Sequence, residues 1–304
     1  MEPTLDGVNL NPASKIRPAS TLILVKDHSG KIEVNLVRRS EKSGFMSGKY
    51  VFPGGTVNEI DRMDHIWREK LDLSPQMIME RLGGGLDLEE IIAYGISSIR
   101  ETFEESGIFL ATRKSGQHLF GADSSGLESD ASPDWLEKAI QFESSVLQFS
   151  RLYRWSHWIT PKLMQKRYDT RFFLSIVPEK TCCRPDSVEV TESIWIAPED
   201  ALQGNLTGEI PLSPPTLVTL HELLKFRNIS ELQKEIEGRS WGAPIFPRMV
   251  LMDNGSVILE PWDPEYENET ILINREQLEE SILPVGFPFS RIWNNGEVWR
   301  PVSA

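Results

Sequence analysis

The sequence is poor in residues that several protein classes depend on, beginning with cysteine. Its 304 residues include two cysteines, Cys182 and Cys183, and these are adjacent. Neighbouring cysteines form a strained and rarely used disulfide, so a disulfide-stapled secreted domain is excluded and both are expected to be reduced thiols. The five histidines are scattered, so neither residue type has the spacing of a zinc site.

Long apolar stretches are missing as well. No run of about 18 apolar residues occurs, which argues against a membrane-spanning helix. The first residues, "MEPTLDGVNLNPASK", contain no apolar segment suited to a signal peptide, and the last, "RPVSA", do not form the peroxisomal Ser-Lys-Leu address. We therefore expect a soluble intracellular protein, located in the cytoplasm, with no membrane partner.

Positive charge is scarce relative to negative charge. Lysine and arginine number 32, aspartate and glutamate 45, and the net charge is −13. Such a chain repels nucleic acid and anionic membranes, so no stable nucleic-acid partner is expected. A small polyanionic substrate would need bound cations or a local cluster of basic residues. No G-x-S-x-G sequence occurs, which argues against a hydrolase with a serine nucleophile elbow.

The apolar residues follow the spacing of an α/β protein. With 39% hydrophobic residues, the chain can build one large domain or two smaller ones. Apolar runs predict buried strands, and helical spacing predicts helices, one of which ends at Gly107. The predicted strands include 20–25, 31–39, 51–55, 108–112, 156–161 and 171–178; helices are predicted over 87–106 and 132–153, with two more between 214 and 238, and a hairpin over 248–262.

Three glutamates on the helix ending at Gly107 are candidates for metal binding. Offsets of three and four residues place Glu101, Glu104 and Glu105 on one face, where their charges repel each other. A solvated acidic face is the commoner fate of such a pattern. The alternative is a hard cation, Mg²⁺ or Mn²⁺, which takes one or two carboxylates together with substrate phosphate oxygens and waters.

The surroundings of these acids resemble the Nudix box, G-x5-E-x7-R-E-U-x-E-E-x-G-U, where U is usually apolar. Two departures from that motif are substitutions, because Thr102 stands at the first U position and Asp61 replaces the first glutamate. The third is an insertion, since residues 62–99 occupy the place of seven. The positions that match are Gly55, Arg100, Glu101, Glu104, Glu105, Gly107 and Ile108.

An interrupted box is a mark of one branch of the Nudix superfamily, the acyl-coenzyme A diphosphatases. The sequence is similar to that branch outside the box too, over about residues 17–260. The segments that carry the resemblance are "SGFMSGKYVFPGG", "WSHWITP", "RYDTRFFLSIVP" and "TESIWIAPEDAL".

The resemblance implies a Nudix α/β/α sandwich with a mixed sheet. Residues 1–16 would be a polar leader and 17–205 the Nudix domain, with 62–99 looping out over its surface. Residues 206–304 would form an α+β extension packed on that domain. The ends of the insertion should lie close together, with Asp61 near the amino end of the helix that carries the glutamates.

The implied activity is metal-dependent hydrolysis of the diphosphate bond of coenzyme A or acyl-coenzyme A. The products are 3′,5′-ADP and (acyl-)4′-phosphopantetheine, and the cofactor is Mg²⁺ or Mn²⁺. Members of the branch also occur in peroxisomes, so a peroxisomal or mitochondrial location stays open. Two other functions stay open as well: a diphosphatase of another nucleoside diphosphate derivative, such as a dinucleotide, sugar nucleotide or RNA cap, and a non-catalytic Nudix-fold binding module.

The resemblance also implies roles for individual residues. Glu101 and Glu105 are the expected metal ligands, and Glu104 is a further ligand or a catalytic residue. Arg100 is expected to pair with a box glutamate and orient it, and Gly55 to allow a tight turn beside the helix. The general base is a box glutamate or an acid of a later loop, for which Glu189 and Glu192 are candidates and Glu192 is favoured.

Basic residues in two regions are candidates for binding the phosphate-rich part of the substrate. A solvated basic face is the alternative for any one of them. Together they could hold the 3′-phospho-ADP half of coenzyme A. The candidates are Arg38, Arg39, Lys49, Lys162, Lys166, Arg167 and Arg171.

Overall fold

The centre of the computed structural model is a seven-stranded mixed sheet, and the structure describes residues 15–41, 46–120, 135–142, 144–183, 190–253 and 255–304. The strands follow the order β3-β2-β1-β8-β7, with β4 paired to β1 and β9 to β2. Only the β1–β8 pair is parallel among the pairs of this sheet in the described residues. The strands are β1 (Ile16–His28), β2 (Lys31–Arg39), β3 (Tyr50–Val51), β4 (Gly54–Thr56), β7 (Tyr153–Ile159), β8 (Arg167–Ile176) and β9 (Val190–Ile196).

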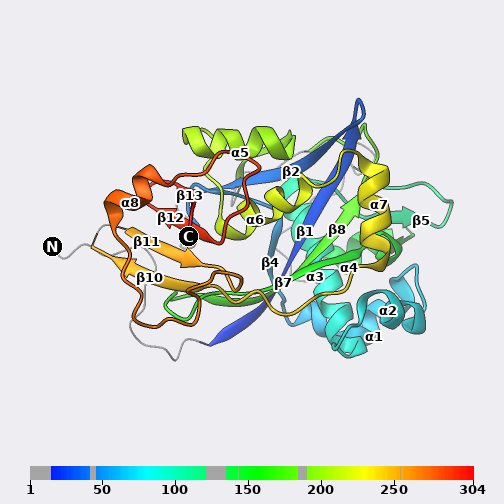
Figure 1. Ribbon diagram of the computed structural model, residues 1–304. Coiled ribbons are helices and arrows are strands. Elements are labelled where there is room, and N and C mark those ends of the chain that lie inside the picture. The colour runs from blue at the N-terminus through cyan, green and yellow to red at the C-terminus, as the bar shows by residue number, and fades with distance from the viewer. Residues whose placement is uncertain (1–14, 42–45, 121–134, 143, 184–189, 254) are drawn as a thin grey trace.

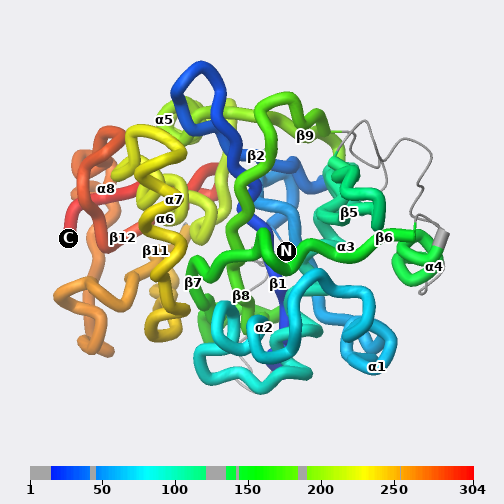
Figure 2. The backbone as a smooth tube through the Cα atoms, turned by 90° about the vertical axis from the view of Figure 1, so that its right-hand side faces the viewer, coloured from blue at the N-terminus to red at the C-terminus, as the bar shows by residue number. Residues whose placement is uncertain are grey.

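Helices cover both faces of this sheet, as the resemblance implied (Figures 1 and 2). Alternation along β1 directs Leu22 and Leu24 into a core with α3 (Leu88–Ser106), and Ile23 and Val25 into a second core. That second core also holds side chains of α5 (Pro198–Thr207), α6 (Pro214–Leu223) and α7 (Ile229–Gly238). The predicted α/β/α sandwich is confirmed.

Helix α3 carries strong signals at both of its ends. Asp87 and Glu90 form a reciprocal capping box at the start, and Gly107 ends the helix in the left-handed conformation with φ of 71°. The interior is apolar on the face towards the sheet, and Ile92, Ile96 and Ile99 are fully buried. The predicted helix over 87–106 and its glycine cap are confirmed.

The interruption of the box is shorter and better packed than the sequence predicts. Residues 88–99 are the first part of α3. The part of the insertion that leaves the two halves of the box, called the excursion below, therefore ends before Leu88. It contains the short helices η1 (Ile60–Arg62), α1 (Asp64–Trp67), η2 (Arg68–Lys70) and α2 (Pro75–Leu82). Trp67, Ile78 and Leu82 are fully buried in the core of α3, because the excursion has an apolar face to cover.

The excursion is also fixed to the C-terminal part of the chain. The indole Nε1 of Trp241 donates to the carbonyl oxygens of Leu82 and Gly83, at 2.9 and 3.0 Å. A Cβ at Gly84 would lie 2.8 Å from that indole, at a φ of +63°. Gly83 and Gly84 therefore form a junction with Trp241.

The C-terminal residues add a second sheet, in the order β10-β11-β12-β13 (orange to red in Figure 1). Met249, Ile258 and Ile292 of this sheet share a core with β1, β2 and β8. The elements are β10 (Arg248–Met252), β11 (Gly255–Leu259), α8 (Arg275–Glu280), β12 (Arg291–Asn294) and β13 (Trp299–Val302). The predicted hairpin is β10–β11.

The long helix predicted over 132–153 is the main error in secondary structure, although 132–134 and 143 lie outside the described residues. The helix α4 (Trp135–Phe142) is short, and Ser144 has a positive φ of 47°, which ends helical geometry. The strand β6 (Ser145–Leu147) then pairs with β5 (Ala111–Arg113), and a 3-10 turn, η4 (Phe149–Arg151), follows. None of the helices in the described ranges is long and apolar enough to cross a membrane.

Candidate active site

One cavity of about 780 Å³ lies where the box helix meets strands β1 and β4. The three box glutamates line one end of it, together with Arg39 and Arg100. Gly54 and Gly55 of β4 form the wall opposite the helix. The periodicity of α3 and the return of β4 along β1 therefore bring both halves of the box to one cavity.

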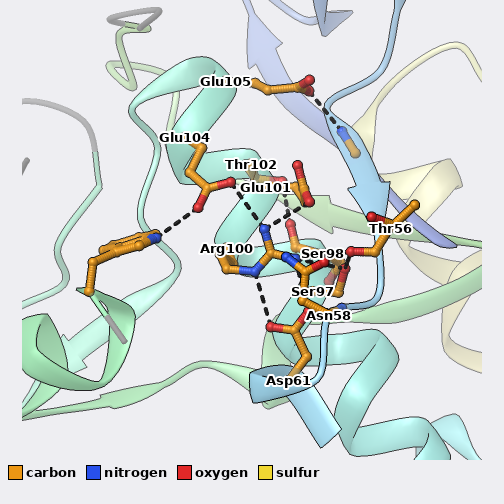
Figure 3. A network of polar contacts seen from close by, with 12 residues as sticks. Thr56, Asn58, Asp61, Ser97, Ser98, Arg100, Glu101, Thr102, Glu104 and Glu105 are labelled. Atoms are coloured by element: carbon orange, nitrogen blue, oxygen red, sulfur yellow. Dashed lines mark hydrogen bonds and ion pairs between the residues drawn. The ribbon is translucent and has the colours of Figure 1, made fainter. Parts of the chain in front are cut away.

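Arg100 is the centre of the polar network at this end (Figure 3). Its Nε and Nη2 donate to the two carboxylate oxygens of Asp61, at 3.0 and 2.8 Å. Its Nη1 donates to Glu101 and Glu104, at 2.8 and 3.1 Å. Burial disfavours the charge of Arg100, but these carboxylates outweigh it, and the pKa of the guanidinium is raised.

Glu101 fits against Gly55 because the glycine has no side chain. A Cβ on Gly55 would lie 2.4–2.5 Å from the carboxylate atoms of Glu101. Gly55 is outside the left-handed region, so its role is close approach and not the tight turn expected from the sequence. The side chain of Glu101 is 14% exposed.

The other two glutamates are held by partners on separate elements. Glu104 accepts from the indole Nε1 of Trp135 at 2.7 Å, in addition to Arg100. Glu105 accepts from the backbone N–H of Gly54 at 2.9 Å, and its carboxylate lies 3.8 Å from Nη1 of Arg39. Each glutamate is thus oriented before any ligand binds.

The charges of the cluster favour a bound cation. Four carboxylates, from Asp61 and the box glutamates, face two guanidinium groups, from Arg39 and Arg100. Burial raises the pKa of Glu101 to about 7 despite the charge of Arg100, and burial also raises the pKa of Glu104. A divalent ion would offset this excess of negative charge.

The arrangement fits a cation that uses few protein ligands. No three acidic, histidine or cysteine side chains of the described residues converge closely enough, as they stand, to hold one ion. Mg²⁺ takes one or two carboxylates and completes its shell with phosphate oxygens and waters. Glu101 and Glu105, which both line the cavity, suit that requirement.

Both substitutions within the box have a structural reason. Thr102 is fully buried, and its hydroxyl donates to the carbonyl of Ser98 at 2.6 Å, so the polar group is satisfied inside the core. Asp61 is also fully buried, against the last third of α3 and not at its amino end as predicted. The two ends of the insertion are close, as predicted, because Asp61 binds Arg100.

Comparison with known proteins agrees with this geometry. The model of the NUDT19 Nudix domain matches residues 13–223, more than half of the 304-residue chain. The chain belongs to the NUDT19 Nudix domain family. It is a Nudix pyrophosphohydrolase.

Two relatives and one solved structure show the extent of the similarity. A protein of Xenopus laevis named acyl-coenzyme A diphosphatase NUDT19 is 28% identical, over 88% of this chain and 82% of its own. The Homo sapiens protein of that name is also 28% identical, over 84% and 79%. The crystal structure of a NUDIX hydrolase from Alicyclobacillus acidocaldarius is 24% identical with a TM-score of 0.61, covering 76% of this chain and 99% of its own, which confirms the fold.

Among the basic residues that the sequence analysis names as candidates for substrate binding, Arg39 lines the Nudix cavity. Within the described residues its buried Nε has no hydrogen-bond partner, so its N–H can donate to a further acceptor such as a phosphate oxygen. Arg38 instead donates to the carbonyl of Gly48 at 3.4 Å, and Lys49 donates to the carbonyl of Glu297. Neither Arg38 nor Lys49 lines the cavity.

The basic residues of β8 and the loop before it also lie away from the cavity. Tyr168, Thr170 and Phe172 line it, so alternation turns Arg167 and Arg171 to the opposite face of the strand. Arg167 donates to the carbonyl of Thr160 at 3.1 Å. Arg171 lies 5.4 Å from the ring centre of Trp241, a contact with the core. Lys162 and Lys166 are exposed and also outside the cavity wall.

The candidate bases of the later loop are not part of the same wall. Glu192 is exposed on β9 and accepts a hydrogen bond from the Tyr50 hydroxyl at 2.6 Å. Burial, with this bond, raises the pKa of Tyr50 to about 12. Glu189 lies outside the described residues. Among the acids considered in the sequence, those on the cavity wall are Glu101, Glu104 and Glu105.

Several residues of the site carry no signal in the sequence. Trp135 hydrogen-bonds Glu104 although the two are 31 residues apart in the sequence, and no motif predicts this pair. Met249, Ile258 and Trp299 line the cavity from the C-terminal sheet, which follows the box by more than a hundred residues. Ser20 lines it from β1, and its buried hydroxyl has no partner among the described residues. Only an alignment of relatives or the structure itself could connect such distant positions.

Proposed function

We propose that this chain hydrolyses the diphosphate bond of coenzyme A and its acyl esters, with Mg²⁺ or Mn²⁺ as cofactor. The products are 3′,5′-ADP and (acyl-)4′-phosphopantetheine. The observation that carries the proposal is the cavity in which all three box glutamates of a NUDT19 Nudix domain meet Arg39 and Arg100. The names of the relatives, acyl-coenzyme A diphosphatase NUDT19, supply the substrate class.

The box residues divide the work of binding and orientation. Glu101 and Glu105 would hold the cation, with Glu104 as a further ligand. A bound divalent ion neutralises charge on the diphosphate oxygens and makes a coordinated water more acidic. Arg100 keeps Glu101 and Glu104 oriented, and Asp61 in turn fixes Arg100. Arg39, with its unpartnered Nε, is the group best placed to bind a phosphate oxygen.

Proton removal from the attacking water needs a base on the cavity wall. Glu104 is our first choice, because it is 30% exposed at the cavity and less enclosed than Glu105. Glu192 is the alternative. A base should be within hydrogen-bond reach of the water or one water away, and the carboxylate of Glu192 is engaged with Tyr50.

A panel of substrates tests the proposal. Initial rates with Mg²⁺ would be measured for coenzyme A, acetyl-coenzyme A, NADH, ADP-ribose, a sugar nucleotide and a capped RNA. We expect coenzyme A and its ester to have the highest kcat/KM. If they are cleaved no faster than NADH or ADP-ribose, the chain is a diphosphatase of another nucleoside diphosphate derivative. If nothing is cleaved with either metal, the proposal of catalysis is wrong.

A further inference from the structure

The half of the cavity remote from the box glutamates has a different chemical character. Large apolar side chains from two sheets line it, together with a few hydroxyl-bearing residues. Trp158 and Phe172 stand on β7 and β8 of the central sheet. Met249, Ile258 and Trp299 stand on β10, β11 and β13 of the C-terminal sheet. All five side chains are at most 8% exposed.

An open space between buried apolar side chains is unusual unless a ligand fills it. Protein interiors are ordinarily packed without voids of this size. The cavity volume of about 780 Å³ is within the range of small-molecule sites, which are mostly apolar with a few polar groups at one end. The polar end here is the cluster of box glutamates. Such a cavity suits a ligand that is charged at one place and neutral beyond it.

Charge decides which part of a coenzyme A ester suits the apolar half. Among the described lining residues, positive charge is confined to Arg39 and Arg100, which bind the box glutamates. The 3′-phosphate of the nucleotide half would enter an apolar space without a counter-charge, which is costly. The pantetheine arm and the acyl chain are neutral, and burying the chain is favourable.

We propose that the C-terminal sheet forms an acyl-binding wall, so that the acyl end of the substrate enters between the two sheets while the nucleotide stays outside. Met249, Ile258 and Trp299 then set the preferred chain length. This inference rests on the proposed function. It adds that acylated coenzyme A, and not free coenzyme A, is the better substrate.

The dependence of affinity on the length of the acyl chain tests the proposed acyl-binding wall. The affinities of coenzyme A and its acetyl, octanoyl and palmitoyl esters would be measured by calorimetry in EDTA, where hydrolysis cannot occur. The values of kcat/KM would be measured separately with Mg²⁺. We expect affinity to rise about two- to fourfold per methylene until the space is full. A flat dependence on chain length would refute the acyl-binding wall, even if coenzyme A is cleaved.

Two matched variants test whether the C-terminal sheet sets the preference for acyl-chain length. Met249→Trp narrows the space from β10, whereas Met252→Trp places the same side chain on the same strand against a different core. Met249→Trp should lower kcat/KM for octanoyl-coenzyme A about tenfold. The loss for free coenzyme A should be clearly smaller, because it has no acyl chain, and Met252→Trp should change neither rate. Equal losses for both substrates, or an equal effect of Met252→Trp, would overturn the inference.

A widening variant covers the case in which Met249→Trp does not fold. Met249→Ala should shift the preference towards longer chains, and an unchanged profile in a folded protein counts against the wall. Failure of the wild type to cleave any coenzyme A ester would refute the proposed function instead. The affinities in EDTA would still decide whether the acyl chain is bound.

Discussion

Asp61 replaces a glutamate of the motif, and its position is fixed mainly by one partner, Arg100. It stands where the Nudix box has glutamate, and it is fully buried. Both of its oxygens accept from Arg100, and one also accepts the backbone N–H of Asn58 at 2.8 Å. A buried ion pair adds little net stability when intact, but the loss of one partner leaves an uncompensated charge. Asp61 therefore acts through Arg100 on the glutamates.

Removing the charge of Asp61 should destabilise the fold. We expect Asp61→Asn to lower the free energy of unfolding by about 3 kcal/mol, because the buried Arg100 loses the carboxylate that accepts two of its hydrogen bonds. Urea denaturation followed by circular dichroism measures the change. Glu279→Gln, in an exposed pair with Arg275, should change it by about 0.5 kcal/mol or less. A loss below about 1 kcal/mol for Asp61→Asn would contradict the account.

Removing the charge of a box glutamate should abolish turnover and spare the fold. Glu101→Gln and Glu105→Gln each delete one negative charge from the cavity wall. We expect metal-dependent kcat/KM to fall on the order of 100-fold or more, with the melting temperature of the metal-free protein retained. Glu89→Gln, on the exposed first turn of α3, is the matched control and should keep full activity. Near-wild-type rates for Glu105→Gln would refute the metal assignment.

At the scale of elements, sequence periodicity identified the face of α3 that meets the site, but not the face of each strand that meets it. The face of α3 that presents the three glutamates follows from their offsets alone. The basic residues around β8 look like one cluster in the sequence. Strand alternation separates them, because Thr170 and Phe172 take the cavity face and Arg171 takes the other. Which face of a strand meets the site depends on the sheet, which the sequence alone does not determine.

The approach of β4 to α3 can be tested by filling the space at Gly55. Gly55→Ala would push a methyl group into the carboxylate of Glu101, which is a flexible end and can move away. We expect activity to fall at least about tenfold while stability changes little. Gly238→Ala, where no atom lies within 4 Å of the added Cβ, should leave activity unchanged. Full activity of Gly55→Ala would mean that Glu101 need not lie against β4.

At the scale of the whole molecule, the excursion and the C-terminal residues belong to the same structure as the box. Trp241 binds the end of the excursion, and Trp299 lines the cavity. The motif predicted the α/β/α fold and the three glutamates. It could not predict these contacts, because no local pattern specifies a partner more than a hundred residues away. The packing of distant apolar faces is decided by the fold.

A buried carboxyl in the C-terminal sheet region should make stability depend on pH. Glu260 is fully buried, neither oxygen has a hydrogen-bond partner among the described residues, and burial raises its pKa from 4.5 to about 8. Between these values the unfolded chain has lost the proton that the folded chain keeps. The free energy of unfolding therefore falls as pH rises from about 4.5 to about 8.

Replacing Glu260 by glutamine should remove this dependence. Melting temperatures measured from pH 5 to pH 9 should fall less steeply for Glu260→Gln than for the wild type, with the difference growing towards pH 8. Both proteins keep the other titrating groups, so the comparison isolates Glu260. Parallel profiles would show that Glu260 does not hold its proton in the folded state.

The central claim is that the two halves of an interrupted box form a working site for the diphosphate bond of acyl-coenzyme A. Mass spectrometry of the products from octanoyl-coenzyme A with Mg²⁺ tests it most directly. The account predicts 3′,5′-ADP and octanoyl-4′-phosphopantetheine, and no such products with Glu105→Gln. Release of octanoate and free coenzyme A, or no reaction at all, would contradict it.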